Sequence, residues 1–166
     1  MSTIHTRPNQ GEFVTWLTPP SVLRNLGEFD LDPCAAPSPR PWATARRHVE
    51  LPENGLEIEW AGRVWLNPPY GTGIMEPWLE KMAKHRSGLT LIFARTETAF
   101  FRDYIWSVAD SLLFIDGRLY FHLPCGTRAK GNSGGPSVLV SYSAEDTRIL
   151  KHSGIAGALV GKISAV

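Results

Sequence analysis

The run Asn67-Pro68-Pro69-Tyr70 carries the strongest chemical signal in the sequence. It directly follows the apolar run 63–66, which is typical of a short strand. The two prolines fix their φ angles and remove two backbone N–H donors. The Asn67 side-chain oxygen and the Pro68 carbonyl therefore remain as neighbouring acceptors on a stiff bend, and Tyr70 adds a flat aromatic face.

Paired acceptors of this kind suit an amino group that is conjugated to a planar ring. The lone pair of such a nitrogen is delocalised, so the amine is a poor nucleophile. Accepting hydrogen bonds from both N–H groups draws the nitrogen toward a tetrahedral shape, and the acceptors then stabilise charge that develops in the transition state. A base could stack on Tyr70. The structural alternative is a rigid turn in which Asn67 starts the bend and Tyr70 packs.

The elements around this bend alternate between strands and helices. Apolar runs and helical spacings predict strands at 29–32, 63–66, 89–94 and 111–115, helices at 18–27, 75–84 and 100–108, a late strand pair at 119–123 and 137–142, and a helix from Ala144. Residues 35–47 are expected to form a surface loop, and 48–60 show no clear period. This order predicts an α/β sandwich with a largely parallel central sheet and a late antiparallel strand pair. Ligands should then bind at the carboxyl ends of strands, just after Asp32, Leu66, Ala94 and Ile115.

Composition narrows the class of protein. The 166 residues, 43% hydrophobic with net charge +1, are enough for one globular domain, expected over 15–166 behind an N-terminal arm at 1–14. Two cysteines cannot make a disulfide framework or a four-ligand zinc site, and the five histidines lack metal-ligand spacing, so we expect no metal. No apolar run approaches about 18 residues, and the start of the chain is polar, so we expect no membrane partner and a cytoplasmic protein.

The run Asn67–Tyr70 resembles the catalytic motif of S-adenosylmethionine-dependent amino methyltransferases that act on adenine N6. Segment 16–20 resembles the stretch before the first strand that helps hold the cofactor, and 29–35 resembles the strand and loop that cradle its methionine part. Asn54 lies where that family often has an acid near the cofactor's adenine ring. From about Thr15 to Tyr142 the chain is similar to the compact phage and prophage type of DNA N6-adenine methyltransferase, including segments 93–96, 117–119 and 135–140.

This resemblance implies a Rossmann-like methyltransferase fold and a site-specific, adenine-specific DNA methyltransferase. It would transfer the methyl group of S-adenosylmethionine directly to N6 of an adenine flipped out of double-stranded DNA, in a bacterial or phage-infected host cell. With no separate recognition domain, a short or weakly specified site is expected. The sequence does not give the oligomeric state.

The same resemblance assigns the site residues. The catalytic residues would be Asn67, Pro68, Pro69 and Tyr70, and the cofactor would contact Trp16, Thr18, Pro19, Asp32, Pro33, Cys34 and Asn54. Thr18 is also a plausible helix N-cap, Asp32 a plausible turn residue, and Trp16 a plausible core residue. Nothing near Cys34 would activate a thiolate, so it is expected to line the site. Glu50 or Glu53 could hold the ribose hydroxyls.

One departure from the family pattern lies after the first strand. The usual Gly-x-Gly is absent, and the chain has Asp32-Pro33-Cys34-Ala35-Ala36-Pro37 instead. A glycine loop that lets the backbone approach the cofactor is therefore not evident at this point.

Cationic residues near the expected strand ends are candidates for contact with DNA phosphates. The substrate set comprises Arg46, Arg47, Arg95, Arg118 and Phe121, the last packing against the target base. Arg40, Arg128 and Lys130 could add to it, and loop 124–136 is a candidate for contact with a base or groove. The alternative for each cation is an ordinary solvated surface.

Two other functions fit the same residues. The motif would also serve N-methylation of another planar amine, such as adenine in RNA or a glutamine side chain of a protein. A non-catalytic DNA-binding module with a methyltransferase fold is a third hypothesis, and the missing glycine loop favours it.

Overall fold

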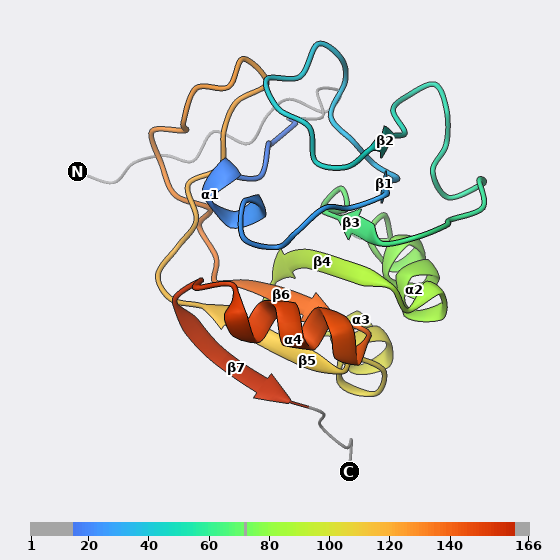
Figure 1. The fold of residues 1–166 in the computed structure, drawn as a ribbon, viewed down its shortest axis with the longest axis vertical. Coiled ribbons are helices and arrows are strands. Elements are labelled where there is room, and N and C mark those ends of the chain that lie inside the picture. Colours follow the sequence, from blue (N-terminus) through green and yellow to red (C-terminus); the bar gives the residue numbers. More distant parts are fainter. Residues whose placement is uncertain (1–14, 72, 162–166) are drawn as a thin grey trace.

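The computed structural model describes residues 15–71 and 73–161 (Figure 1). They contain a seven-stranded sheet in the order β2-β1-β3-β4-β6-β5-β7. Strands β2, β1, β3 and β4 pair in parallel, and the remaining pairs are antiparallel. This arrangement confirms the predicted α/β architecture. The strands are β1 (Leu31–Asp32), β2 (Arg47–His48), β3 (Val64–Leu66), β4 (Gly88–Phe93), β5 (Ser111–Ile115), β6 (Ser137–Ser141) and β7 (Gly157–Gly161).

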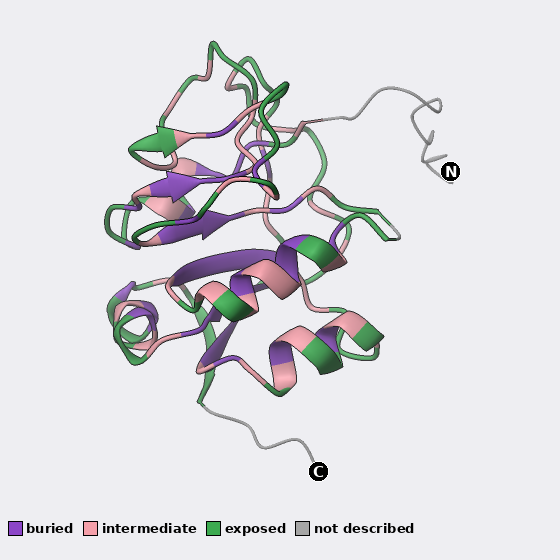
Figure 2. Cartoon of the chain, turned by 90° about the vertical axis from the view of Figure 1, so that its right-hand side faces the viewer, coloured by how far each residue is buried: buried purple, intermediate pink, exposed green. Residues whose placement is uncertain are grey.

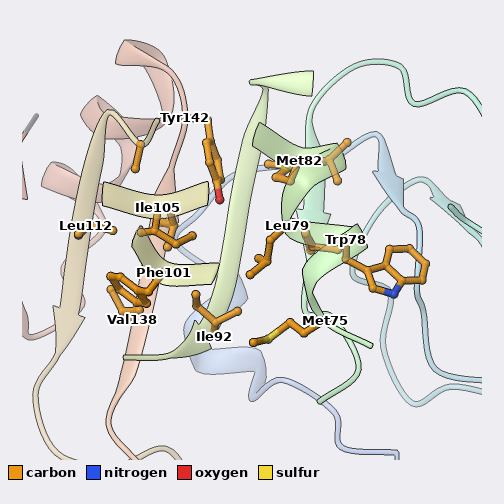
Figure 3. Close-up of a cluster of buried hydrophobic side chains, with 14 of the residues drawn as sticks. Met75, Trp78, Leu79, Met82, Ile92, Phe101, Ile105, Leu112, Val138 and Tyr142 are labelled. Atoms are coloured by element: carbon orange, nitrogen blue, oxygen red, sulfur yellow. The ribbon is translucent and has the colours of Figure 1, made fainter. Parts of the chain in front are cut away.

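Helices cover both faces of the sheet, so the central strands are buried (Figure 2). One core packs α2 (Glu76–His85), α3 (Ala99–Phe101) and the π-helical turn η1 (Arg102–Trp106) against the sheet. Ten of its side chains are labelled in Figure 3. The other core holds α1 (Pro20–Leu23) and α4 (Ala144–His152).

Successive side chains along the central strands alternate between these two cores. In β4, Leu89 and Leu91 enter the α1–α4 core, whereas Ile92 enters the α2–α3 core. In β6, Val138 and Val140 likewise face opposite to Leu139. Because successive strand side chains point to opposite faces, a continuous apolar run such as β4 fills both cores at once.

Three sequence-based expectations are wrong in detail. The segment 119–123 is not a strand; His122 makes only isolated bridges to Leu17 and Arg128, and the antiparallel partners of β6 are β4 and β5. The last helix ends at His152 and an edge strand, β7, follows it. All of β7 is exposed, so it lacks the alternating burial that marks a strand in sequence. Residue Arg47, placed in a loop, pairs in β2.

The N-terminal part differs from expectation as well. Helix α1 begins at Pro20, and its N-cap is Pro19, without a side-chain cap hydrogen bond. Thr18 is therefore not the cap, which leaves its hydroxyl free for another partner. The arm predicted for 1–14 lies outside the described residues, which begin at Thr15.

A buried carboxylate fastens α4 to the parallel half of the sheet. Asp146 is only 2% exposed, and its N–H donates to the side chain of Ser143, the N-cap of α4. One of its oxygens accepts from Arg63 Nε at 2.7 Å, and the other accepts from the Gly88 N–H at 2.9 Å. One side chain thus joins the first turn of α4 to the starts of β3 and β4.

Replacing this carboxylate should destabilise the fold. Because Asp146→Ala leaves Arg63 and the Gly88 N–H without their partner, we expect a loss of about 3–5 kcal/mol in the free energy of unfolding, measured by urea denaturation. The control is Asp103→Ala, which removes an exposed ion pair with Arg102 and should change stability by less than about 1 kcal/mol. Equal effects of the two variants would contradict the role given to Asp146.

Candidate active site

A cavity of about 970 Å³ opens where β1, β3 and β4 end. Because these strands run in parallel, the loops that follow them meet at one edge of the sheet. Further walls come from the segment before α1 and from residues 129–134. The residues predicted from sequence that line this cavity are Trp16, Thr18, Asp32, Pro33, Cys34, Asn54, Asn67, Pro68, Pro69, Tyr70 and Phe121. Pro19 lies beside it as the cap of α1 but is not part of its lining.

The Asn67 carboxamide has a defined orientation. Its amide nitrogen donates to Thr18 Oγ1 at 3.3 Å, and Thr18 is itself buried. Its oxygen is buried and has no hydrogen-bond partner among the described residues. A buried acceptor without a partner carries a desolvation cost of about 1–3 kcal/mol, which a ligand N–H would relieve. Asn67 thus lines the cavity and carries a buried side-chain acceptor without a partner among the described residues.

Tyr70 lies at the other end of the same bend. Its ring is 40% exposed and packs on Phe93, with ring centroids 4.7 Å apart and planes tilted by 31°. Burial raises the pKa of the Tyr70 phenol, and the nearby charge of Arg95 lowers it in part. The phenol is therefore neutral, and Phe93, at the end of β4, supports the ring from behind.

Cys34 connects the loop after β1 to the bend after β3. Its thiol donates to the Asn67 carbonyl at 3.3 Å. Burial raises the pKa of this thiol well above its usual value, and the negative charge of Asp32 raises it further. The protonated thiol is a hydrogen-bond donor and a poor nucleophile.

Asp32 is a buried carboxylate on the cavity wall. It is 5% exposed, and burial raises its pKa to about 6, despite hydrogen bonds from the Thr44 hydroxyl and the Cys34 N–H and the nearby charge of Arg40. A carboxylate held at this cost at neutral pH suits a cationic partner such as a ligand ammonium group.

Close backbone approach occurs at a glycine that lies outside the expected motif. A Cβ on Gly55 would lie 1.8 Å from the Pro33 carbonyl oxygen, so only glycine fits there. The loop after β1, which lacks glycine, is thus packed against a glycine from the segment before β3. Trp60 Nε1 donates to the Gly55 carbonyl at 2.7 Å and holds this contact in place.

Both candidate ribose-binding acids, Glu50 and Glu53, already have partners within the protein. Glu50 accepts from the Ser38 N–H and hydroxyl and pairs with Arg40, and Glu53 pairs with Arg47. The Asn54 carboxamide closes on its own turn, donating to Glu57 and accepting from the Leu56 N–H. Glu50, Glu53 and Asn54 line the cavity but already have protein partners.

The predicted DNA contacts fall into two groups. Arg46 pairs with Glu28 and Asp30, and Arg47 pairs with Glu53, so neighbouring carboxylates offset their charges. Arg95 is exposed and forms no ion pair with any described residue. Arg118 donates to the Gly134 carbonyl, next to the wall 131–134. Of the five predicted substrate residues, Phe121 alone reaches the cavity lining.

Several lining residues were missed by sequence reasoning. Phe93 directly precedes Ala94, one of the strand ends where chemistry was expected, and its position was the available signal. Trp42, Thr44, Ile74 and Trp78 gave no such signal, because loops and packing bring them to the cavity. Residues 131–134 belong to loop 124–136, which was expected to contact a base or groove, and they line the cavity. Trp42 lies edge-on to His122, with ring centroids 5.2 Å apart, so that the segments before β2 and after β5 meet here.

Two further observations concern metals and membranes. Among residues 15–71 and 73–161, no group of three or more histidine, cysteine, aspartate or glutamate side chains is arranged to hold a metal ion. No helix within the same ranges is long and apolar enough to cross a bilayer.

Together these features fit a ligand with a cationic amine and a second, planar partner. The cavity volume lies at the upper end of the range of about 300–1,000 Å³ for small-molecule sites. Asp32 supplies the buried anion, Gly55 allows close packing of the wall, and the free Asn67 oxygen points to an N–H donor. These residues fit S-adenosylmethionine beside an aromatic amine.

Comparison with known proteins identifies the family of the chain. The family model of DNA N-6-adenine-methyltransferase (Dam) matches residues 6–152, which is most of the chain. No curated protein and no solved structure matches it significantly. The matched range includes every predicted site residue, from Trp16 to Phe121. The chain therefore belongs to the DNA N-6-adenine-methyltransferase (Dam) family.

Proposed function

We propose that this protein transfers the methyl group of S-adenosylmethionine directly to N6 of adenine in DNA. The observation that carries the proposal is the Asn67 carboxamide, whose nitrogen is held by Thr18 and whose buried oxygen has no partner among the described residues. Family membership supports adenine in DNA as the substrate. S-adenosylmethionine supplies an electrophilic methyl group on a sulfonium centre.

Asn67 and Pro68 would orient the adenine amine. The amine donates one N–H to Asn67 Oδ1 and the other to the Pro68 carbonyl, which aims the nitrogen lone pair at the methyl carbon. A bond forms from nitrogen to carbon, the carbon–sulfur bond breaks, and the nitrogen releases one proton to solvent. Pro69 keeps the bend stiff, so the acceptors need no reorganisation during the reaction.

The cofactor would lie against the loops after β1 and before β3. Asp32 pairs with its ammonium group, Thr18 and Trp16 border its methionine part, and Pro33, Cys34 and Asn54 form the wall opposite. Pro19 supports Thr18 at the start of α1. The Gly55 contact keeps this wall thin, which is the role that a glycine loop after β1 would otherwise have.

The target adenine would leave the double helix and stack on Tyr70. Flipping a base costs a few kcal/mol, which stacking and hydrogen bonds in the pocket repay. Phe93 supports Tyr70, and Phe121, which also lines the cavity, would pack against the base. The exposed cations Arg95 and Arg118 would contact phosphates, and Arg46 and Arg47, whose charges are offset by neighbouring carboxylates, would contribute less.

A direct test is to incubate the protein with radiolabelled S-adenosylmethionine and, separately, double-stranded DNA, RNA and protein. We expect label on N6 of adenine in DNA. Label in RNA or on glutamine would instead support one of the related activities, and no transfer together with DNA binding would support a non-catalytic module.

In the same assay, Asn67→Ala should lower kcat by about 10²–10³, because it removes a preorganised acceptor at the reacting nitrogen. Asn67→Asp keeps an acceptor oxygen and should retain more activity than Asn67→Ala. Unfolding curves would check that each variant folds. Near-normal turnover of folded Asn67→Ala would refute the proposed role.

Asp32 makes cofactor binding depend on pH. Because its pKa is raised to about 6, the carboxylate that would pair with the ammonium group is present above pH 6. We expect calorimetric affinity for S-adenosylmethionine to fall as pH drops through about 6, and Asp32→Asn to bind weakly at every pH.

The same substitution should stabilise the protein. A raised carboxyl pKa means that the folded state holds its proton longer than the unfolded chain, so stability declines as pH rises from about 4 to 6 and remains lower above. A shift from 3.8 to about 6 corresponds to about 3 kcal/mol as an upper bound. Asp32→Asn should therefore raise Tm at pH 8 while weakening cofactor binding. Lower Tm with unchanged affinity would contradict this assignment.

DNA affinity should depend more on Arg95 than on Arg46. Arg95→Gln removes a cation that no described carboxylate pairs with, and the slope of log K against log salt should fall by about one. Arg46→Gln is the matched control, because Glu28 and Asp30 already offset that charge. Fluorescence anisotropy with a DNA duplex measures both, and equal slopes for the two variants would argue against this ranking.

A further inference from the structure

Strands β1 and β2 place a histidine beside the buried carboxylate of the cavity. Asp32 and His48 are register partners in this parallel pair. Asp32 lines the cavity, whereas His48 does not. The chain between the two strands, 33–46, leaves the sheet and returns, and it carries Thr44 into the cavity wall.

His48 holds the end of that loop through one ring nitrogen. Its Nε2 lies 3.0 Å from the Thr44 amide nitrogen and 3.3 Å from that of Ala45. Both are backbone donors, so Nε2 must be the acceptor and carries no proton. The ring is therefore the neutral tautomer with its hydrogen on Nδ1, and it fixes the backbone of Thr44.

Thr44, whose backbone is held by His48, is in turn hydrogen-bonded to the Asp32 carboxylate. Its hydroxyl donates to Asp32 Oδ2, while the Cys34 N–H donates to Oδ1 at 3.2 Å. Asp32 is thus held from both sides, once from its own loop and once through Thr44. The Thr44 hydroxyl also favours the charged form of Asp32 and opposes the effect of burial on its pKa.

We propose that His48 is a positioning residue which, by accepting the Thr44 and Ala45 N–H groups, keeps the Thr44 hydroxyl on Asp32 and so orients this carboxylate for the ammonium group of the cofactor. The link from His48 to Asp32 stands on the geometry alone. Only its last step, to the cofactor, rests on the proposed function.

The arrangement works with a neutral imidazole. Protonation of Nε2 would turn the acceptor into a donor facing two N–H groups, and would release Thr44. Burial and the charge of Arg40 lower the pKa of His48, whereas Glu50 raises it in part. The surroundings of the ring therefore favour the neutral form of His48 at neutral pH, in which Nε2 is an acceptor.

Four variants distinguish the loss of a hydrogen-bonding group from the loss of side-chain volume. His48→Ala removes the acceptor, and His48→Gln keeps an oxygen near the place of Nε2 without a titrating ring. Thr44→Val removes the hydroxyl at nearly constant volume, and Thr44→Ser keeps it. His152→Gln, in an exposed histidine at the end of α4, is the control for substitution as such.

The first measurement needs no cofactor. The side-chain carboxyl ¹³C signal of Asp32 is followed against pH in the free protein. Because a hydrogen bond to a charged group contributes about 1.5–3 kcal/mol, we expect the Asp32 pKa to rise by about one unit in His48→Ala and Thr44→Val. The pKa should stay near its original value in His48→Gln, Thr44→Ser and His152→Gln. An unchanged Asp32 pKa in folded Thr44→Val and His48→Ala would overturn the proposal.

The second measurement is calorimetric affinity for S-adenosylmethionine at pH 7. We expect it to be about tenfold weaker in His48→Ala and Thr44→Val and near that of the original protein in the Gln and Ser variants. Failure of His48→Gln to restore both measurements would also overturn the proposal. If the unmodified protein binds no S-adenosylmethionine, the proposed function fails, and the ¹³C titration still decides the role of His48.

Discussion

The site depends on the hydrogen bond between Asn67 Nδ2 and Thr18 Oγ1. A carboxamide can turn either its nitrogen or its oxygen toward a given partner, and this contact fixes the choice, so that the buried oxygen is left as an acceptor without a partner among the described residues. The contact requires α1 to start at Pro20, since an N-capping Thr18 would use its hydroxyl within the helix. It also requires β3 to end at Leu66, between β1 and β4, where parallel pairing brings the loop edges together. The prolines and the Cys34 thiol then hold the bend.

Sequence reasoning reached those features that depend on local pattern. The apolar runs at β3, β4, β5 and β6 and the spacing Met75, Trp78, Leu79 and Met82 predicted real elements, because each buries a periodic set of side chains. The segment 119–123 has strand-like composition, but its His122 forms isolated β-bridges with Leu17 and Arg128 and does not pair with the sheet. Strand β7 has no buried face. Such pairings are set by distant parts of the chain, so no local window contains them.

The same distinction applies to the site. Asn67, Tyr70 and Asp32 stand out because their types and positions at strand ends are unusual together, and all line the cavity. Thr44 and Gly55 could not be found in this way, because their partners Asp32 and Pro33 lie more than ten residues away in the sequence. His48 could not be found either, because its contacts with Thr44 and Ala45 connect it to Asp32 only in the folded chain. The missing Gly-x-Gly shows the difference most clearly. A search for glycine after β1 finds none, whereas the close backbone contact of this loop is made by Gly55, which packs on Pro33 from the segment before β3.

Two buried polar groups of the cavity each lower the stability of the free protein. Asp32 holds its charge against burial, and the Asn67 oxygen lies buried without a partner, so each makes the free protein less stable than an apolar wall would. A ligand that brings a cation to Asp32 and an N–H donor to the Asn67 oxygen would offset both costs. Under the proposed function, the interactions that the free protein lacks at these two groups are the ones made in the reacting complex, where they contribute to the rate.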